Sequence, residues 1–280
     1  TLSATMMSLG YIGNLSATEP FVWIMGWIGW RWGFSVAIFG ILVSAVLMLL
    51  VVRDAPPGSD WTKREPEPLL SVIRGLGEIF RHPAMPGLIG AALIGYSTNF
   101  AIRGLWLGLY MVDIHGLGTS VTGRLLFAMA ALGTIGIFLA GWISSRLGTP
   151  RPVVLIFAGI SFSCMTTLAL WSDIPTTALI VVLLVFGLFS NFFPAIIEHG
   201  RSLFDDRLRG RSLTSINVWV FVGVGVTQPV SGFIMESFMP AGATTGALPE
   251  EAYRALATNL AVLVLAGVSA YALFARYRRS

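Results

Sequence analysis

The stretch of residues 33–52 decides the fold class, and it reads GFSVAIFGILVSAVLMLLVV. It contains no charged side chain. A helix rises about 1.5 Å per residue, so a helix of this length crosses a hydrocarbon core roughly 30 Å thick. Because backbone groups in lipid need hydrogen-bond partners within their own segment, such a span forms a helix and not a strand. The stretch therefore predicts a transmembrane helix.

The whole chain has the composition of a membrane protein. Of its 280 residues, 55% are hydrophobic and 11% are charged, and the mean hydropathy is +0.78. Soluble domains carry about 25% charged residues. These residues cannot cover a water-soluble fold of this length with a polar surface. The composition therefore excludes a soluble domain.

Further apolar runs of similar length follow along the chain. The predicted spans are 2–28, 33–52, 85–112, 120–143, 152–172, 176–198, 212–237 and 255–275. Residues 30–32 are predicted to connect the first two spans. Within the longer polar segment 53–84, apolar residues recur at helical spacing over 69–80, which predicts a short amphipathic helix at the membrane surface. The sequence thus predicts an all-α polytopic membrane protein with about eight transmembrane helices.

Basic residues are concentrated in alternate connections. The segments 53–84, 144–151, 199–211 and 276–280 hold 14 of the 18 Lys and Arg residues. The positive-inside rule places these segments, and with them the C-terminus, in the cytoplasm. We expect a multi-pass protein of the bacterial inner membrane. The net charge of +4 is then a signal of topology, and no nucleic-acid partner is expected.

Several short motifs occur in a fixed order. A loop at 141–151 reads GWISSRLGTPR, and Gly29, Trp30 and Arg31 precede Phe34. Residues 104–110 read GLWLGLY, and residues 209–214 read RGRSLT, followed by Asn217, Gln228, Pro229 and Gly232. Together with the long basic segment 53–84, these features resemble the major facilitator superfamily. The resemblance covers nearly the whole chain.

The resemblance implies a twelve-helix fold in which this chain supplies helices 5 to 12. Residues 1–52 would end the N-terminal half, 53–84 would be the linker, and 85–280 would be the C-terminal half. The chain opens with Thr1 inside an apolar run, so we expect helices 1 to 4 to precede it. The loop at 141–151 is similar to the family's G-x-x-x-D-R-x-G-x-R-R gating loop, with Ser145 where the family often has Asp. The gating residues implied are Gly141, Ser145, Arg146, Gly148 and Arg151.

Polar residues within the spans are the candidates for substrate contact. Arg103 lies within span 85–112, and a charge at that depth costs at least ~2.5 kcal/mol on insertion scales. It is expected to capture an anionic group; a structural ion pair or outward snorkelling is the alternative. The substrate-binding candidates are Arg103, Asn99, Tyr96, Trp106, Asn191 and Gln228. Helix packing competes with this role for Tyr96 and Asn99, and interfacial anchoring competes for Trp106.

Glu19 is the acidic residue that lies well inside a span. It could bind a coupling proton, could pair with Arg103, or could have an unrelated structural role. The family's antiport-type pattern in helix 5 ends in Gly-Pro, and Glu19 with Pro20 stands in that place. At the end of span 176–198, Glu198 and His199 are expected to form a solvated helix end.

The function implied is secondary active transport by alternating access. The expected substrate is an organic anion, a zwitterion or a drug-like compound, with ion or proton coupling. A channel or a receptor or sensor is the alternative class. An enzyme is not expected, because the sequence contains no HExxH, no GxSxG, no P-loop and no clustered His or carboxylates. No metal and no cofactor is expected, and Cys164 is the single cysteine.

Overall fold

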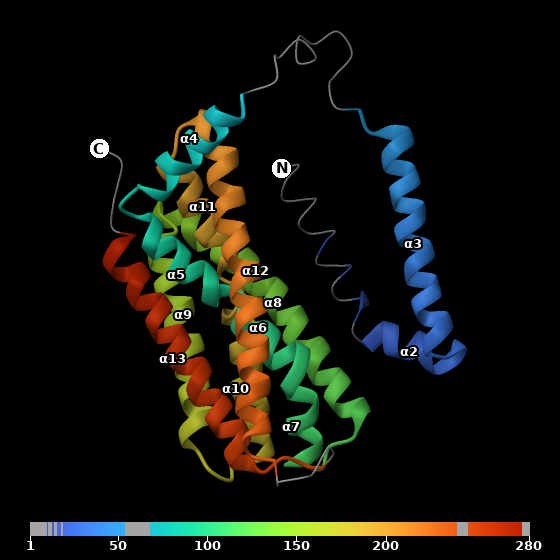
Figure 1. The fold of residues 1–280 in the computed structure, drawn as a ribbon. Helices are drawn as coiled ribbons and strands as arrows, with labels where there is room; N and C mark the ends of the chain where they lie inside the picture. The colour runs from blue at the N-terminus through green and yellow to red at the C-terminus, as the bar shows by residue number, and fades with distance from the viewer. Residues whose placement is uncertain are drawn as a thin grey trace. The chain divides into compact units, whose positions relative to one another are not determined.

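The structure is a computed structural model that describes residues 10, 13, 16–17, 19–53, 68–239 and 246–275 (Figure 1). The chain divides into two compact units, Thr1–Arg74 and Gly75–Ser280. The boundary lies inside the segment 53–84, which the sequence predicts as a linker. The assignment of the units to the two halves of a twelve-helix fold stays a prediction.

The first unit contains helices α2 (Glu19–Ile28) and α3 (Trp30–Val51). They are joined at Gly29, whose φ of 79° is a left-handed conformation that glycine adopts without strain. The predicted connection at 30–32 is therefore wrong, because α3 already begins at Trp30 and Gly29 alone makes the turn. Phe21 and Phe34 pack edge to face across it, 5.6 Å apart. Much of the predicted span 2–28 lies outside the described residues.

The second unit is a bundle of helices. Helix α4 (Leu69–Phe80) crosses the unit boundary, and its bounds match the predicted amphipathic helix. The following helices are α5 (Met85–Gly95), α6 (Ser97–Ala101), the π-helix η2 (Ile102–Trp106), α7 (Leu107–Asp113), α8 (Thr119–Leu147), α9 (Arg151–Leu170), α10 (Thr176–Phe189), α11 (Phe193–Leu203), α12 (Asp206–Glu236) and α13 (Glu250–Phe274). No strand occurs among the described residues.

Within the described part of the chain, seven helical segments are long and apolar enough to cross a membrane. They correspond to the seven predicted spans from 33–52 onward, with ends that differ by a few residues. The all-α polytopic class is confirmed. Proline lies in the first turn of α5, α9 and α11, as Pro86, Pro152 and Pro194, where the missing N–H has no helical partner to lose.

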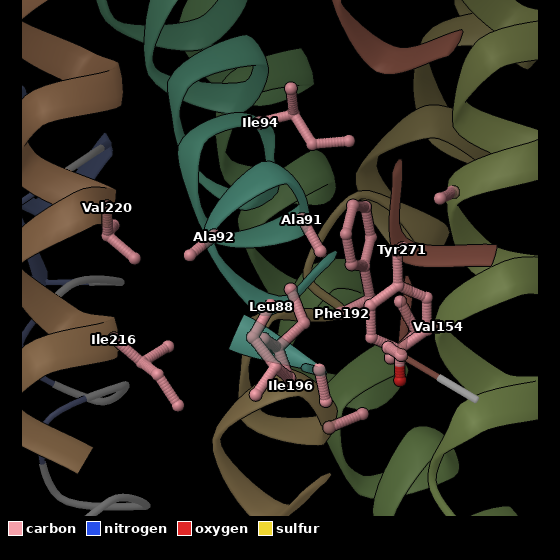
Figure 2. Packing of buried hydrophobic residues seen from close by; sticks show 14 of the residues in the cluster. Leu88, Ala91, Ala92, Ile94, Val154, Phe192, Ile196, Ile216, Val220 and Tyr271 are labelled. Atoms are coloured by element: carbon pink, nitrogen blue, oxygen red, sulfur yellow. The ribbon is translucent and has the colours of Figure 1, made fainter. Parts of the chain in front are cut away.

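The helices of the second unit pack in pairs along their lengths (Figure 1). Helix α13 packs along α9 and α5, α12 packs along α5 and α6, and α10 packs against α8 and α9. Buried apolar side chains fill the space between them. Figure 2 shows one such cluster, in which Leu88 of α5 lies close to Phe192 and to Ile196 of α11.

Helices α8 and α10 approach each other through glycine. A Cβ on Gly136 would collide with the carbonyl oxygen of Leu188, and a Cβ on Gly133 would collide with the side-chain amide of Asn191. From the other helix, a Cβ on Gly187 would lie 3.0 Å from the Cα of Met129. Small residues allow this backbone approach, which is a common way for membrane helices to associate.

Candidate functional site

The first span of the second unit, Met85–Asp113, is not one regular α-helix. Helix α5 ends at Gly95, α6 follows, and the π-helix η2 occupies Ile102–Trp106. A π-helix widens the turn by one residue and is often found at functional sites. Arg103 and Trp106, both predicted site residues, lie on this segment. The π-helix was missed from sequence because hydropathy reports length and polarity, not the register of backbone hydrogen bonds.

A second break separates α10 from α11 at residues 190–192. Ser190 closes α10, and Pro194 lies in the first turn of α11. The predicted single span 176–198 is therefore two helices in line. Ser190 and Asn191 lie at the break and are both buried.

Asn99 links the two irregular segments. Its side-chain Nδ2 donates to the Ser190 hydroxyl at 2.6 Å, and its Oδ1 accepts from Arg103 Nη1 at 3.4 Å. Asn99 is buried, and Arg103 is half-buried. The structure thus brings two predicted site residues together and adds Ser190, which the sequence analysis did not select.

The guanidinium of Arg103 has unused hydrogen-bonding capacity. Its Nε is buried and has no hydrogen-bond partner among the described residues. No carboxylate in the described part of the chain forms an ion pair with it. An uncompensated charge in a low-dielectric site is costly, so this group is suited to an incoming anion. Glu19, the predicted alternative partner, begins α2, and its side chain lies outside the described residues.

Trp106 forms a hydrogen bond with another helix. Its Nε1 donates to the Ser231 hydroxyl of α12 at 2.8 Å, and that hydroxyl donates to the carbonyl of Gln228 at 2.6 Å. The indole N–H is therefore satisfied inside the protein. A small apolar pocket adjoins the π-helix, lined by Trp106 and by Tyr253 of α13. Ser231 was missed because a serine after a helix proline has no distinguishing sequence signal.

Three further candidates take other positions. Tyr96 lies at the break between α5 and α6, and its ring meets Phe193 edge on at 5.4 Å. Asn191 donates to the carbonyl of Gly187 in the preceding turn at 3.3 Å. Gln228 is half-buried and contributes its backbone carbonyl to the Trp106 contact. Their roles in substrate binding stay predictions.

The predicted gating loop is wrong as a loop over most of its length: residues 141–147 belong to the end of α8, residues 148–150 connect the two helices, and Arg151 begins α9. Gly148 ends α8 with φ 63°, a left-handed conformation that favours glycine. The Ser145 hydroxyl donates to the carbonyl of Trp142, and Arg146 lies over the Trp142 ring at 5.3 Å. Arg151 reaches another helix, since its Nη2 donates to the carbonyl of Ala272 on α13 at 3.0 Å. The remaining motif residue is Gly141, where a Cβ would meet open space. The gating role of the motif stays a prediction.

The helix end at residues 198–199 differs from the prediction. Glu198 is exposed and pairs with Arg201 at 3.8 Å, as a solvated end requires. His199 is 5% exposed and forms a 2.6 Å hydrogen bond with the Tyr271 hydroxyl of α13. The prediction is wrong for His199 because α11 packs against neighbouring helices and the side chain contacts Tyr271 of α13.

At the other end of α13, Asp113 forms a cluster that the sequence analysis did not identify. Its Oδ2 accepts from the Tyr253 hydroxyl at 2.6 Å and from the backbone N–H of Leu248 at 3.1 Å. The contacts attach the start of α13 to the end of α7.

In the connection that follows α7, burial lowers the pKa of His115, whose Nδ1 lies 3.1 Å from the Thr176 hydroxyl.

The long apolar helices define an integral, multi-pass helical membrane protein. Residues 2–228 match the model of the Major Facilitator Superfamily. The chain belongs to this family of membrane transporters.

Individual relatives and solved structures agree with this assignment. The chain is 24% identical to the uncharacterised MFS-type transporter YhhS of Escherichia coli O157:H7, over 83% of the chain and 57% of the relative. It is 25% identical to an uncharacterised MFS-type transporter of Burkholderia mallei (strain SAVP1), over 73% of the chain and 49% of the relative. The chain therefore spans about half the length of the curated relatives it matches.

Two solved transporters share the fold. The inward-open xylose transporter XylE of Escherichia coli aligns with a TM-score of 0.53 at 20% identity, over 70% of this chain and 48% of that chain. A bacterial homologue of the human lysosomal transporter Spinster, inward-facing and occupied, aligns with a TM-score of 0.52 at 18% identity, over 88% and 56%. At these identities the likeness concerns the fold.

Proposed function

We propose that this chain is the C-terminal part, helices 5 to 12, of a secondary active transporter that moves a small solute by alternating access. The family match and the half-length coverage of the relatives support the proposal. Residues 1–52, 53–84 and 85–280 would be the end of the first half, the linker and the second half. Helices 1 to 4 would complete the cavity, in an inner membrane with the C-terminus in the cytoplasm.

The substrate class we propose is an organic anion or a zwitterion, coupled to an ion or proton. The observation that carries this proposal is Arg103: a half-buried guanidinium on a π-helix, with a buried Nε that has no hydrogen-bond partner among the described residues. A guanidinium binds a carboxylate through two parallel hydrogen bonds. Asn99 and Ser190 would hold it in position, and Trp106 would border the same segment.

The test is counterflow in proteoliposomes that contain the complete transporter. The probes are benzoate as an anion, tryptophan as a zwitterion and ethidium as a drug-like cation. We expect exchange of an anionic or zwitterionic probe, reduced about tenfold or more in Arg103→Gln because one charged hydrogen-bonding contact is lost. Arg103→Lys should recover only part of it, since an ammonium lacks the planar fork.

Arg124→Gln is the matched control, because Arg124 is an exposed arginine near the start of α8. It should exchange the same probe at the wild-type rate. An unchanged rate in Arg103→Gln would refute substrate contact by Arg103. Dissipation of the probe gradient without exchange would instead indicate a channel.

A further inference from the structure

A buried polar cluster joins three helices of the second unit outside the Arg103 network. His199 on α11 and Tyr271 on α13 are 5% and 0% exposed. The His199 Nδ1 lies 2.6 Å from the Tyr271 hydroxyl, and the two rings meet nearly at right angles. Arg151, at the start of α9, donates to the carbonyl of Ala272, the residue after Tyr271. Figure 2 shows Tyr271 among apolar side chains, next to Val154.

His199 holds a distinct place among the histidines. The chain contains three, and His82 and His115 lie in connections between the candidate spans, whereas His199 lies within the candidate span Thr176–Leu203. Histidine is the side chain whose ordinary charge change falls between about pH 5 and 8. A proton taken up by His199 would therefore add a positive charge inside the bundle.

Several ionisable groups lie at the same end of the helices as His199. The described ionisable groups at this end of the packed helices are Tyr271 on α13, Arg151 on α9, Arg146 on α8, Arg207, Arg209 and Arg211 on α12, Asp205 just before α12, and Glu198 and Arg201 on α11 itself. Helix α5 contributes none. Glu198 and Asp205 are exposed, and Glu198 pairs with Arg201. Arg151 reaches this cluster through its hydrogen bond to the carbonyl of Ala272, the residue after Tyr271.

Protonation of His199 would change two things: its hydrogen bond with Tyr271 and the charge next to Arg151. The proton adds to the ring nitrogen that carries none, after which both nitrogens are donors and the Tyr271 hydroxyl can only accept from the ring. A second positive charge would then lie beside Arg151 in a site screened from water, where repulsion is strong. The repulsion acts between α11 and the pair formed by α9 and α13.

We propose that His199 is a proton-binding site of this protein, and that proton uptake there loosens α11 from α9 and α13. The proposal rests on the proposed transport function, because it names the proton as the ion that acts on the second half. It also gives Arg151 of the predicted gating loop a physical link to α11, through α13.

The first test needs no substrate. Amide hydrogen exchange is measured by mass spectrometry on the complete protein in nanodiscs at pH 7.5 and 5.5, with correction for intrinsic rates. In the wild type, we expect the exchange rate across α11 to rise about tenfold at the lower pH, because the free energy of local opening of this helix falls. In His199→Gln the rise should be absent. In the control His115→Gln the rise should equal that of the wild type.

A second variant covers the case in which His199→Gln fails to fold. Tyr271→Phe removes the hydroxyl and leaves His199 able to titrate, so α11 should exchange faster at pH 7.5 and still respond to acid. Wild-type exchange in Tyr271→Phe, or a full acid response in His199→Gln, would overturn the proposal.

A transport assay separates this proposal from the proposed function. Counterflow of the exchanged probe is compared with its accumulation under an imposed pH gradient, with pyranine in the vesicle lumen to report protons. We expect His199→Gln to keep counterflow and to lose accumulation driven by the gradient. Normal gradient-driven accumulation in His199→Gln would refute the role of His199, whereas absence of both activities in the wild type would refute transport itself.

Discussion

Asn99 connects the two broken helices with a single side chain, since one amide group binds both Ser190 and Arg103. Hydrogen bonds between membrane helices are worth about 1 kcal/mol, up to roughly 1.7. We expect Asn99→Ala to lower the free energy of unfolding by about that amount, measured by denaturant unfolding in detergent.

Ser190→Ala removes only one end of the same contact. The double variant should therefore be no less stable than Asn99→Ala, within about 0.5 kcal/mol. Ser163→Ala is the control, because this exposed hydroxyl bonds within its own helix, and it should be neutral. Full additivity of the two changes would show that the amide and the hydroxyl are not partners.

His82 gives a pH dependence at the start of α5. Its Nδ1 accepts the backbone N–H of Ala84 at 3.2 Å, and burial lowers the pKa of the ring. Above the ordinary pKa of about 6.5 the ring is neutral in both folded and unfolded chains; below it only the unfolded chain binds the proton readily. Stability should therefore fall as the pH drops from 7 to 5.

Thermal unfolding across this pH range checks the prediction. His82→Gln should show a smaller loss of stability on acidification than the wild type, and Ala84 should exchange its amide proton faster at all pH values. His115→Gln should reduce the loss independently, because burial lowers its pKa as well. A wild-type pH profile in His82→Gln would contradict the assignment.

Single residues could be predicted where polarity stands out from an apolar run. Arg103 and Asn99 were selected in this way, and the structure places them in contact, while their role in substrate binding stays a prediction. His199 was misjudged because a position near a helix end says nothing about which neighbours cover it. Ser231 and Asp113 were not found, since their partners, Trp106 and Tyr253, are distant in sequence and only the packing joins them.

At the level of the helices, the π-helix sets the positions of Arg103 and Trp106 together. Deleting Gly104 would remove the extra residue of the wide turn and restore an α-helical register, which changes the angle between Arg103 and Trp106 about the helix axis. The Arg103 and Trp106 contacts could then no longer both form. We expect the deletion to abolish counterflow.

Gly104→Ala is the matched control, because a Cβ there meets open space. It should keep counterflow, since it adds one methyl group and leaves the register unchanged. Equal activity of the deletion and of Gly104→Ala would show that the wide turn has no part in transport.

The glycine contact between α8 and α10 makes a prediction about stability. Gly136→Ala forces a methyl group onto the carbonyl of Leu188, and overpacking of this kind costs about 1–3 kcal/mol or more. Gly159→Ala on α9 places the same methyl group in open space and should be neutral or slightly stabilising. Thermal unfolding in detergent compares the two; equal melting temperatures would contradict the close approach.

Helices were the elements that the sequence predicted best. Span length and hydrophobicity dictate a crossing, and the predicted limits fall within a few residues of the described helices. Interruptions were harder: residues 190–192 break a helix without a charged residue, and Gly29 makes a turn that was assigned to the next three residues. Both depend on local backbone geometry that composition does not encode.

Considered as a whole, the second unit should present its two ends to opposite sides of the membrane. Ser172 lies in the connection between α9 and α10, and Ser202 lies at the end of α11; both are exposed. Cys164, the one native cysteine, is buried. We expect an impermeant maleimide to label Ser172→Cys in intact cells and Ser202→Cys in inverted vesicles. Labelling of both from one side would refute the crossing pattern.

The family could be predicted from short motifs in order, and the match over residues 2–228 confirms it. The substrate has no such signature. In the proposed transporter, the chemistry of the substrate would depend on side chains from both halves, and Arg103 is the group that we propose for the second half.

The bond from Arg151 to the carbonyl of Ala272 has an evolutionary consequence. Every amino acid carries a main-chain oxygen, so substitutions at position 272 cannot delete the acceptor, whereas most changes at position 151 delete the donor. Substitutions of Ala272 on α13 thus keep this hydrogen bond, whereas substitutions of Arg151 on α9 remove it. A saturation library should show a flat fitness profile at Ala272, apart from residues too large to fit, and a sharp preference for arginine at 151.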